Sequence, residues 1–375
     1  MSREARRRVE GVMDGIPMPV LIVDAGSRTI GANPAAEALF GPRLLDRPFV
    51  TIIRHPVVLQ ALDWVLRPDR HVPPPPDPAL PPPPKGGLTL RAQIPADRRE
   101  VAAEITVSRL ASTLGEGAIV AILDRSAAEE GEQLRRDFVA NVSHELKTPL
   151  TAMTGFIETL RGPARDDAKA RARFLDIMER EAGRMNRLVS DLLSLSRVQA
   201  EERRRPQGSV DLPLLLRGVL ATMQPVAEAQ GVLIETEGLD GDQRVPGDAD
   251  QLIQVFQNLI DNALKYGGAG GYLGLRLRHV RHEPLLRGSG WSVVIEDRGE
   301  GIDEIHLPRL TERFYRVDTH RSREQGGTGL GLAIVKHIVN RHRGRFRIES
   351  MKGEGSRFTV ILPEGHAGQG RAGTV

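Results

Sequence analysis

The chain has 375 residues, a formal net charge of +3 and no cysteine, which allows two or three domains and excludes disulfides and thiol redox chemistry. Its arginine-rich runs lack the interleaved aromatic residues of a nucleic-acid groove, so we expect no direct binding of nucleic acid. No apolar run reaches the ~18 residues of a transmembrane span, and we expect a cytoplasmic protein, with a peripheral contact at the inner membrane through the basic N-terminus as the alternative.

The first part of the chain alternates short strand and helix patterns. Val20–Val23 is an apolar run of strand length, and Asn33 before Pro34 predicts the cap and the first position of a short helix. Helical spacing follows at His55–Leu66. Three turn-separated stretches then predict antiparallel strands, at residues 88–93, 100–110 and 117–123.

A proline-rich stretch at residues 73–84 interrupts this pattern. Because proline cannot continue a helix or a central strand, we expect an extended spacer loop there. The order of short strands, helices and a three-stranded return resembles a PAS sensor domain. The resemblance rests on this pattern alone and implies a PAS-like sensor over residues 1–126.

Two long helical patterns follow, from residue 127 to about Arg161 and from about Asp167 to Ala200. The second carries residues at alternating spacings of four and three, the pattern of a coiled-coil seam with one acidic position. A hairpin of two such helices, over residues 127–202, needs a second copy to cover its apolar face, so we expect a homodimer built on a four-helix bundle. The seam residues are Phe174, Met178, Glu181, Met185, Leu188, Leu192 and Leu195.

The stretch FVANVSHELKTPL in the first long helix places a histidine opposite an apolar stripe. His144 lies roughly 200° around the helix from Val142 and Leu146, and should therefore face solvent. Thr148 stands one turn beyond it, and Glu145 lies beside it, within reach of an imidazole nitrogen or of a water. A neutral imidazole is a competent nucleophile at neutral pH, and a carboxylate on its other nitrogen would favour attack.

The remainder of the chain has the pattern of an α/β domain. We expect a flexible linker at residues 203–209, the domain itself at residues 210–363, and a disordered tail rich in glycine at residues 364–375.

One helix expected in this domain, Asp248–Tyr266, has a polar face. Asn258, Asn262 and Lys265 fall at i, i+4 and i+7 and share that face, opposite the apolar residues of the helix. Amide oxygens are hard ligands for Mg²⁺, and lysine is a point charge for phosphate. This polar face is therefore suited to binding a metal cation together with phosphate groups. The alternative is an ordinary helix face in contact with solvent.

Two glycine-rich stretches complete the pattern of the domain. Asp297 ends an expected strand, and Gly299 and Gly301 after it let backbone approach a ligand such as adenine, whose amino hydrogens a carboxylate can accept. Residues 326–332, GGTGLGL, precede a helix, where backbone N–H groups and the helix dipole favour phosphate. This stretch lacks the lysine of a P-loop and does not directly follow a strand as in a Rossmann fold.

These motifs, in this order, resemble those of sensor histidine kinases. FVANVSHELKTPL resembles the phosphoacceptor box of that family. The resemblance implies that His144 is phosphorylated, that Glu145 is the general base, and that Thr148 takes part in phosphatase activity.

The nucleotide motifs resemble the N, G1, F and G2 boxes of the same family, in NLIDNALKY, DRGEG, LTERFYRVD and GGTGLGL. The resemblance implies binding of ATP and Mg²⁺, with Asn262 as the magnesium ligand, Asp297 on adenine, and a mobile lid over residues 317–325. The implied nucleotide contacts are Asn258, Asn262, Lys265, Tyr266, Asp297, Gly299, Gly301, Phe314, Arg316, Gly327, Thr328, Gly329, Leu330 and Gly331.

The resemblance implies a multidomain α+β fold: a PAS-like sensor, a dimeric helical hairpin and an α/β-sandwich ATPase domain. It implies a protein-histidine kinase that passes the phosphoryl group to an aspartate of a response regulator, with a winged-helix transcription factor as the expected partner. Within the family the motifs look most like phosphate-regulon sensor kinases of the PhoR type, which implies phosphate-starvation signalling.

Two alternatives stay open. One is a catalytically degenerate kinase that acts as a scaffold or phosphatase. The other is a clamp-type ATPase of the same fold, but such enzymes carry a glutamate base where this chain has Asn258.

Overall fold

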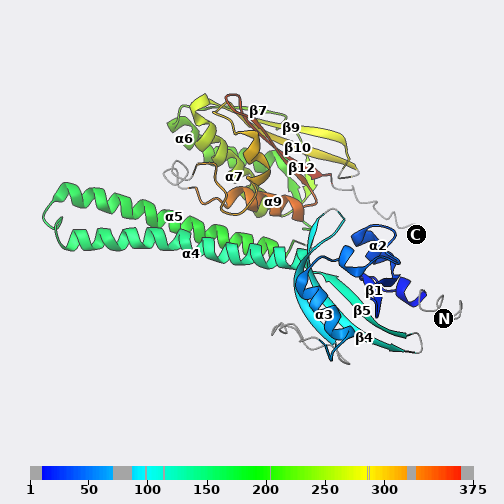
Figure 1. Cartoon of the computed structure of the whole chain (residues 1–375). Helices are drawn as coiled ribbons and strands as arrows, with labels where there is room; N and C mark the ends of the chain where they lie inside the picture. Colours follow the sequence, from blue (N-terminus) through cyan, green and yellow to red (C-terminus); the bar gives the residue numbers. More distant parts are fainter. Residues whose placement is uncertain are drawn as a thin grey trace, which may run out of the picture. The chain divides into compact units, whose positions relative to one another are not determined.

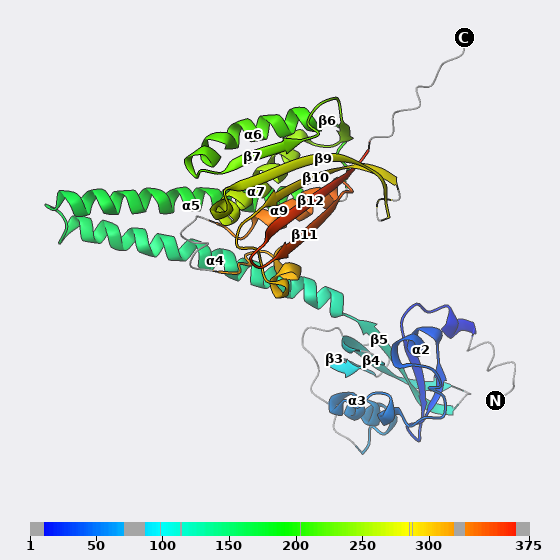
Figure 2. The same cartoon turned by 90° about the horizontal axis from the view of Figure 1, so that it is seen from above.

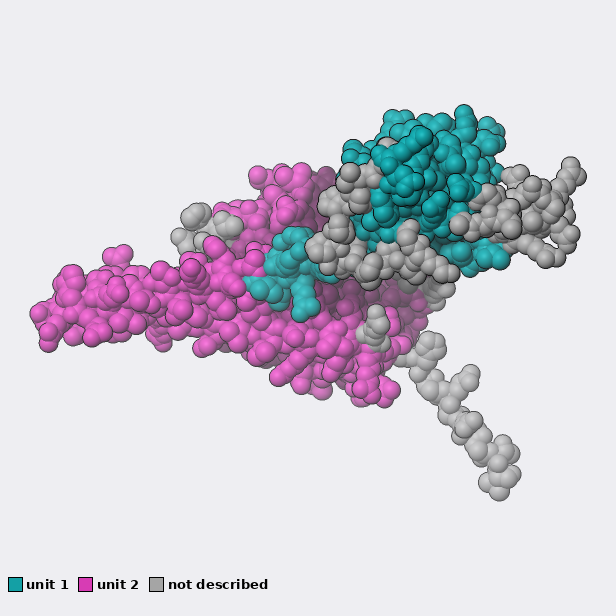
Figure 3. All heavy atoms as spheres, turned by 60° about the horizontal axis from the view of Figure 1, so that its bottom comes forward, with its two compact units in different colours: residues 1–139 teal, residues 140–375 magenta. Residues whose placement is uncertain are grey.

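The computed structural model describes residues 11–70, 87–97, 99–112, 115–202, 204–284, 286, 288–318 and 327–364. The chain divides into two compact units, residues 1–139 and 140–375, and the division falls inside the long helix α4 (Ser126–Arg161) (Figure 3). The expected proline-rich loop, most of the expected lid and the tail after Glu364 lie outside the described residues. Within the described residues, no helix combines the length and apolar character needed to cross a membrane.

The first unit is built on an antiparallel sheet of five strands in the order β2-β1-β5-β4-β3. Asn33 caps α2 (Pro34–Phe40) as expected, and its side chain also accepts a hydrogen bond from the Val20 N–H at 3.0 Å. Helix α3 (Pro56–Leu66) packs on β3, β4 and β5 and buries its apolar face in their shared core. The strands are β1 (Val20–Asp24), β2 (Thr29–Ala32), β3 (Gly87–Pro95), β4 (Glu100–Ser112) and β5 (Gly115–Asp124).

The two expected long helices form an antiparallel pair. Helix α5 (Ala168–Ala200) begins at its N-cap Asp167 and runs back alongside α4 (Figures 1 and 2). Near the turn between them, the rings of Phe156 and Phe174 stack with centroids 5.2 Å apart. Pro149 lies inside α4 without ending it.

Besides most of the helical hairpin, the second unit contains an α/β domain. Its sheet has the order β11-β12-β10-β9-β7, in which only the β7–β9 pair is parallel, among the described strands. The strands are β7 (Leu233–Glu237), β9 (Tyr272–Glu283), β10 (Gly288–Asp297), β11 (Arg345–Met351) and β12 (Gly355–Pro363). Helices α6 (Leu212–Ala229), α7 (Ala249–Gly267) and α9 (Gly331–Arg341) pack against it. A small sheet pairs β6 (Ser209–Asp211) with β8 (Arg244–Pro246).

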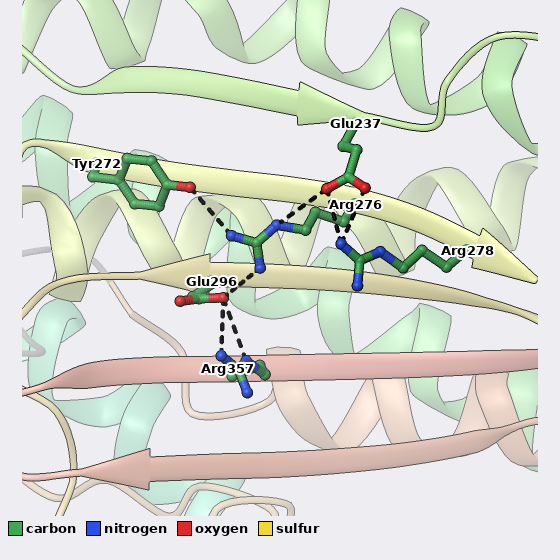
Figure 4. A network of polar contacts seen from close by, with 6 residues as sticks. All are labelled: Glu237, Tyr272, Arg276, Arg278, Glu296 and Arg357. Atoms are coloured by element: carbon green, nitrogen blue, oxygen red, sulfur yellow. Dashed lines mark hydrogen bonds and ion pairs between the residues drawn. The ribbon is translucent and has the colours of Figure 1, made fainter.

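The other face of this sheet carries a ladder of ion pairs (Figure 4). Glu296 on β10 lies between Arg276 on β9 and Arg357 on β12, at 2.8 and 3.2 Å. Glu237 on β7 pairs with Arg278 on β9 at 3.0 Å. Charged cross-strand pairs suit a face in contact with water, which leaves the opposite face for the helices that build the site.

The ends of this domain differ from the sequence-based expectation. Ser209, assigned to the linker, opposes Pro246 in the small sheet. Glu364, assigned to the tail, donates its backbone N–H to the Ser289 carbonyl at 3.2 Å, and its carboxylate accepts from the Ser289 hydroxyl at 2.7 Å. Both residues are ordered by partners far away in sequence, which a local pattern does not reveal.

The second half of α5 packs against α7 and α9. Ser194 donates to the Gln254 side-chain oxygen at 2.7 Å, and Glu201 pairs with Arg341 at 2.5 Å. Leu195 and Val198 are buried between these contacts. One long helix of the hairpin thus packs directly on the α/β domain.

Candidate functional site

His144 is exposed on α4, as its position opposite the apolar stripe predicts. On the other face, Val142 and Leu146 are half-buried and Pro149 is buried. The Thr148 hydroxyl, one turn beyond, donates to the His144 backbone carbonyl at 3.1 Å. An exposed imidazole on a rigid helix is accessible to a phosphoryl donor.

The carboxylate of Glu145 is directed toward α5. It pairs with Arg184 of that helix and lies 3.6 Å from Arg316 of the α/β domain. All three side chains are largely buried, with 14% of Glu145, 9% of Arg184 and 6% of Arg316 exposed. The sequence predicted reach toward the imidazole or a water, and did not predict these two arginine partners.

A cavity of about 600 Å³ in the α/β domain brings together motifs far apart in the sequence. It opens between α7, the loop after β10 and the loop before α9. Eleven of the fourteen predicted nucleotide contacts line it: Asn258, Asn262, Lys265, Tyr266, Asp297, Gly301, Arg316, Gly327, Thr328, Gly329 and Gly331. The folded chain therefore gathers the four boxes around a single pocket.

The other three predicted contacts lie behind the cavity wall. Leu330 is fully buried. Gly299 packs so closely on Gly267 that a Cβ would collide with it. Phe314 donates its backbone N–H to the Gly329 carbonyl at 2.8 Å, and Gly329, at φ +71°, leaves no room for a side chain against it. These residues shape the pocket from behind.

Asp297 lies at the end of β10 and is only 5% exposed. One carboxylate oxygen accepts hydrogen bonds from the backbone N–H groups of Gly299 at 2.9 Å and Ser356 at 3.3 Å. Burial raises the pKa of Asp297, although these two hydrogen bonds act in the opposite direction. A desolvated acceptor at the end of a strand suits the amino group of adenine.

The pKa of Asp297 gives a pH-dependent prediction. Protonation removes an acceptor, so ATP affinity should fall on acidification, beginning at a higher pH than an ordinary aspartate with a pKa of 3.8 would give. The folded protein holds this proton more tightly than the unfolded chain, so without nucleotide the residue lowers stability as pH rises from 3.8 through the raised pKa. Calorimetric titration with ATP across this pH range measures the fall in affinity on acidification. Thermal unfolding without ATP measures the fall in stability as the pH rises.

Asp297→Asn is the matched test of this prediction. The asparagine oxygen can still accept from Gly299 and Ser356, but its NH₂ group faces adenine as a donor. This change should weaken ATP binding about tenfold to a hundredfold, and the affinity that remains should no longer fall on acidification. Asp250→Asn, on an exposed residue of α7, should change neither. Wild-type affinity in Asp297→Asn would place adenine elsewhere.

Amide and cationic side chains also line the cavity. The Asn258 amide lies 3.5 Å from the Gly331 carbonyl, and Lys265 pairs with Asp261 at 2.6 Å. Arg316 donates to the Gly327 carbonyl. No group of three or more histidine or acidic side chains forms a metal cage in the described part of the chain. The amide oxygen of Asn262, which lines the cavity, is a hard oxygen donor and fits Mg²⁺ bound together with phosphate oxygens.

Residues of α5 in the pocket wall were missed by the sequence-based prediction. Arg187, Ser190 and Asp191 all line the cavity. The Thr328 hydroxyl donates to Asp191 at 2.6 Å, and burial raises the pKa of Asp191 although this hydrogen bond opposes the shift. No local signal could have revealed them, because their place depends on how α5 packs against the α/β domain.

Comparison with known families agrees with this architecture. A family described as histidine kinase-, DNA gyrase B- and HSP90-like ATPase matches residues 247–366. The His kinase A (phospho-acceptor) domain matches residues 134–201, which contain His144. A PAS domain matches residues 7–70. The expected multidomain α+β fold is confirmed.

A relative that matches almost the whole chain identifies the family. The phosphate regulon sensor protein PhoR of Pseudomonas aeruginosa is 34% identical over 369 residues, 96% of this chain and 76% of the relative. The sensor-like histidine kinase SenX3 of Mycolicibacterium smegmatis is 40% identical over 247 residues, and this match spans 66% of the chain and 62% of that relative. The solved histidine kinase AdeS of Acinetobacter baumannii is 26% identical, with a TM-score of 0.45, covering 59% of this chain and 98% of that one. The chain belongs to the sensor histidine kinases of two-component systems, which are ATP-dependent protein-histidine kinases.

Proposed function

We propose that the protein phosphorylates its own His144 from Mg-ATP and passes the phosphoryl group to an aspartate of a response regulator. The observation that carries the proposal is the convergence of four separate motifs on one cavity, in the same unit as an exposed histidine on a helical hairpin. The α/β domain would swing on the linker before Ser209 to bring its nucleotide to His144.

The transfer forms a bond between an imidazole nitrogen of His144 and the γ-phosphorus, and breaks the bond from that phosphorus to the bridging oxygen of ADP. The proton on the other imidazole nitrogen passes to the carboxylate of Glu145. Asn262 would hold Mg²⁺, whose charge would neutralise the phosphates, and Lys265 would add a fixed cation. Positioning and charge neutralisation carry most of the rate in phosphoryl transfer.

We assign the dephosphorylation of the response regulator to residues of α4 as well. Glu145 and Thr148 would orient a water toward the aspartyl phosphate of the regulator and so remove the phosphoryl group. The partner is a receiver domain attached to a winged-helix transcription factor, and the stimulus is phosphate starvation. The name of the Pseudomonas relative supports this last assignment.

Labelling with ATP tests the kinase proposal. The purified protein with Mg²⁺ should take label from γ-labelled ATP but not from α-labelled ATP, and the bound label should resist alkali and be lost in acid, as a phosphohistidine does. Release of free phosphate without labelled protein would support the clamp-type ATPase. Bound ATP with neither label nor hydrolysis would support the scaffold.

We also propose that the hairpin pairs with a second copy in a four-helix bundle. The large apolar side chains of α4 and α5 that are exposed on the single chain include Leu150 by 56%, Ile157 by 44%, Leu175 by 52% and Leu193 by 56%. Apolar side chains that recur along a hairpin are typical of an interface.

Replacing Ile157 and Leu175 together by aspartate should break this dimer. Burial of each such side chain contributes about 1.5–3 kcal/mol and each occurs twice, so the dissociation constant should rise by at least about a hundredfold. Sedimentation velocity at micromolar concentration measures it. Leu214→Asp, on a 63% exposed leucine of α6, is the control. A monomeric wild type, or a dimer unaffected by the double change, would contradict the bundle.

A further inference from the structure

A carboxylate of the helical hairpin reaches into the nucleotide cavity. Asp191 on α5 lines this cavity and accepts a hydrogen bond from the Thr328 hydroxyl at 2.6 Å. Thr328 belongs to the glycine-rich loop before α9 and is only 9% exposed. Where α5 packs on the α/β domain, the hydroxyl of this loop is therefore bonded to an acidic side chain of the hairpin.

A second contact repeats this arrangement. Arg316 also lines the cavity, is only 6% exposed, and lies 3.6 Å from the carboxylate of Glu145 on α4. Thr328 and Arg316 are both predicted nucleotide contacts, and both face carboxylates of the hairpin. Carboxylates and phosphates are anions that accept hydrogen bonds through oxygen, so they suit the same donors. The hairpin thus presents to the cavity the chemistry that a nucleotide phosphate would present.

The negative charge of Asp191 also opposes that of a nucleotide. ATP carries several negative charges on its phosphates, and Asp191 adds another to the same cavity of about 600 Å³. Like charges at such separations repel each other, more strongly where water is excluded, and Asp191 is half-buried. The cations Arg187 and Lys265 line the same cavity, and charge that they share with Asp191 is less available to the phosphates.

We infer that Asp191 competes with the nucleotide phosphates for Thr328, so that packing of the α/β domain on α5 and the binding of ATP weaken each other. The inference rests on the proposed function, which places phosphates at the glycine-rich loop. Because coupling between two equilibria is reciprocal, ATP loosens the packing by the same factor by which the packing lowers ATP affinity. Binding of the substrate thus frees the domain for its swing toward His144.

Calorimetric titration of the full chain measures the first half of this coupling. The probe is Mg-AMP-PNP, an ATP analogue that cannot transfer its γ-phosphoryl group. Asp191→Asn keeps an oxygen acceptor for Thr328 but removes the charge, and it should tighten binding about fivefold to fiftyfold, within the usual range of such couplings. Asp191→Ala also removes the acceptor and should bind at least as tightly. Asp176→Asn, on an exposed aspartate of the same helix, should bind like the wild type.

Cross-linking measures the other half, which is the packing of the domain on α5. The Ser194 hydroxyl lies 2.7 Å from the Gln254 side-chain oxygen across this contact, and the chain has no cysteine of its own. In a Ser194→Cys, Gln254→Cys chain, a short bis-maleimide should join the two thiols when the domain is packed on α5. Mg-AMP-PNP should slow formation of this intramolecular product about fivefold or more, and much less once Asp191→Asn is added. A denaturing gel separates the product from cross-linked dimers.

Two results would overturn the inference. Weaker or unchanged binding in Asp191→Asn would show that this carboxylate supports the nucleotide or its metal, or has no influence on either. Cross-linking that proceeds at the same rate with and without Mg-AMP-PNP would show that packing and nucleotide binding are independent. Thermal unfolding followed by circular dichroism shows whether each variant keeps its fold.

The failure of the proposed function gives a different pattern. If the wild-type chain does not bind Mg-AMP-PNP, the nucleotide site itself is wrongly assigned, and the inference about Asp191 fails with it. If the wild type binds the analogue and takes label on His144 from ATP, while Asp191→Asn binds no more tightly, only the inference about Asp191 fails.

Discussion

His144→Gln should carry no label after incubation with γ-labelled ATP, a loss of at least about a thousandfold. The change removes the nucleophile, and glutamine has no nitrogen basic enough to take its place. ATP affinity should be unchanged, because His144 is not among the residues that line the nucleotide cavity. The exposed position predicts an effect on stability within about 0.5 kcal/mol. Filter-bound label and calorimetric ATP titration measure the two quantities.

His282→Gln is the matched control for this loss. His282 is likewise exposed, on β9 of the α/β domain, and should be labelled like the wild type. Label that persists in His144→Gln would show a different acceptor, and the role of the phosphoacceptor box would have to be reassigned.

Asn262→Ala should lower the rate of autophosphorylation by about a hundredfold or more. Asn262 is half-buried on α7 and lines the cavity, and its amide oxygen is the protein ligand assigned to Mg²⁺. With this ligand gone, the phosphates lose the cation that aligns them and neutralises their charge. The rate measured against Mg²⁺ concentration should need more metal to reach half of its maximum.

Two further variants make this prediction specific. Asn262→Asp keeps an oxygen ligand and should retain more activity than Asn262→Ala at high Mg²⁺. Asn340→Ala, on an exposed asparagine of α9 outside the cavity, should show wild-type dependence on Mg²⁺. If Asn262→Ala also kept the wild-type dependence, the metal would be held by other groups.

Features with a short sequence period were predictable. The polar face of α7 follows from residues at i, i+4 and i+7, and all three of its members line the cavity. The exposure of His144 follows from the same helical geometry. The cap residues Asn33, Asp167 and Asp248 act locally, so the starts of α2, α5 and α7 agree with the sequence within one residue.

Features that depend on tertiary packing were not predictable. Asp191 meets Thr328, and Arg184 meets Glu145, only because α5 lies against both α4 and the α/β domain. A heptad pattern gives the seam of a helix but not the partner of its other faces. The order at Ser209 and Glu364 was likewise not predictable, because their partners Pro246 and Ser289 are distant in sequence.

The central claim is that His144 accepts the phosphoryl group. Mass spectrometry of the autophosphorylated protein, digested and kept at alkaline pH, tests it directly, with electron-transfer fragmentation to place the added mass. We expect the phosphoryl mass on His144 alone. The same mass on neighbouring Ser143 or Thr148, on an aspartate, or on no residue of a protein that binds ATP, would contradict the assignment.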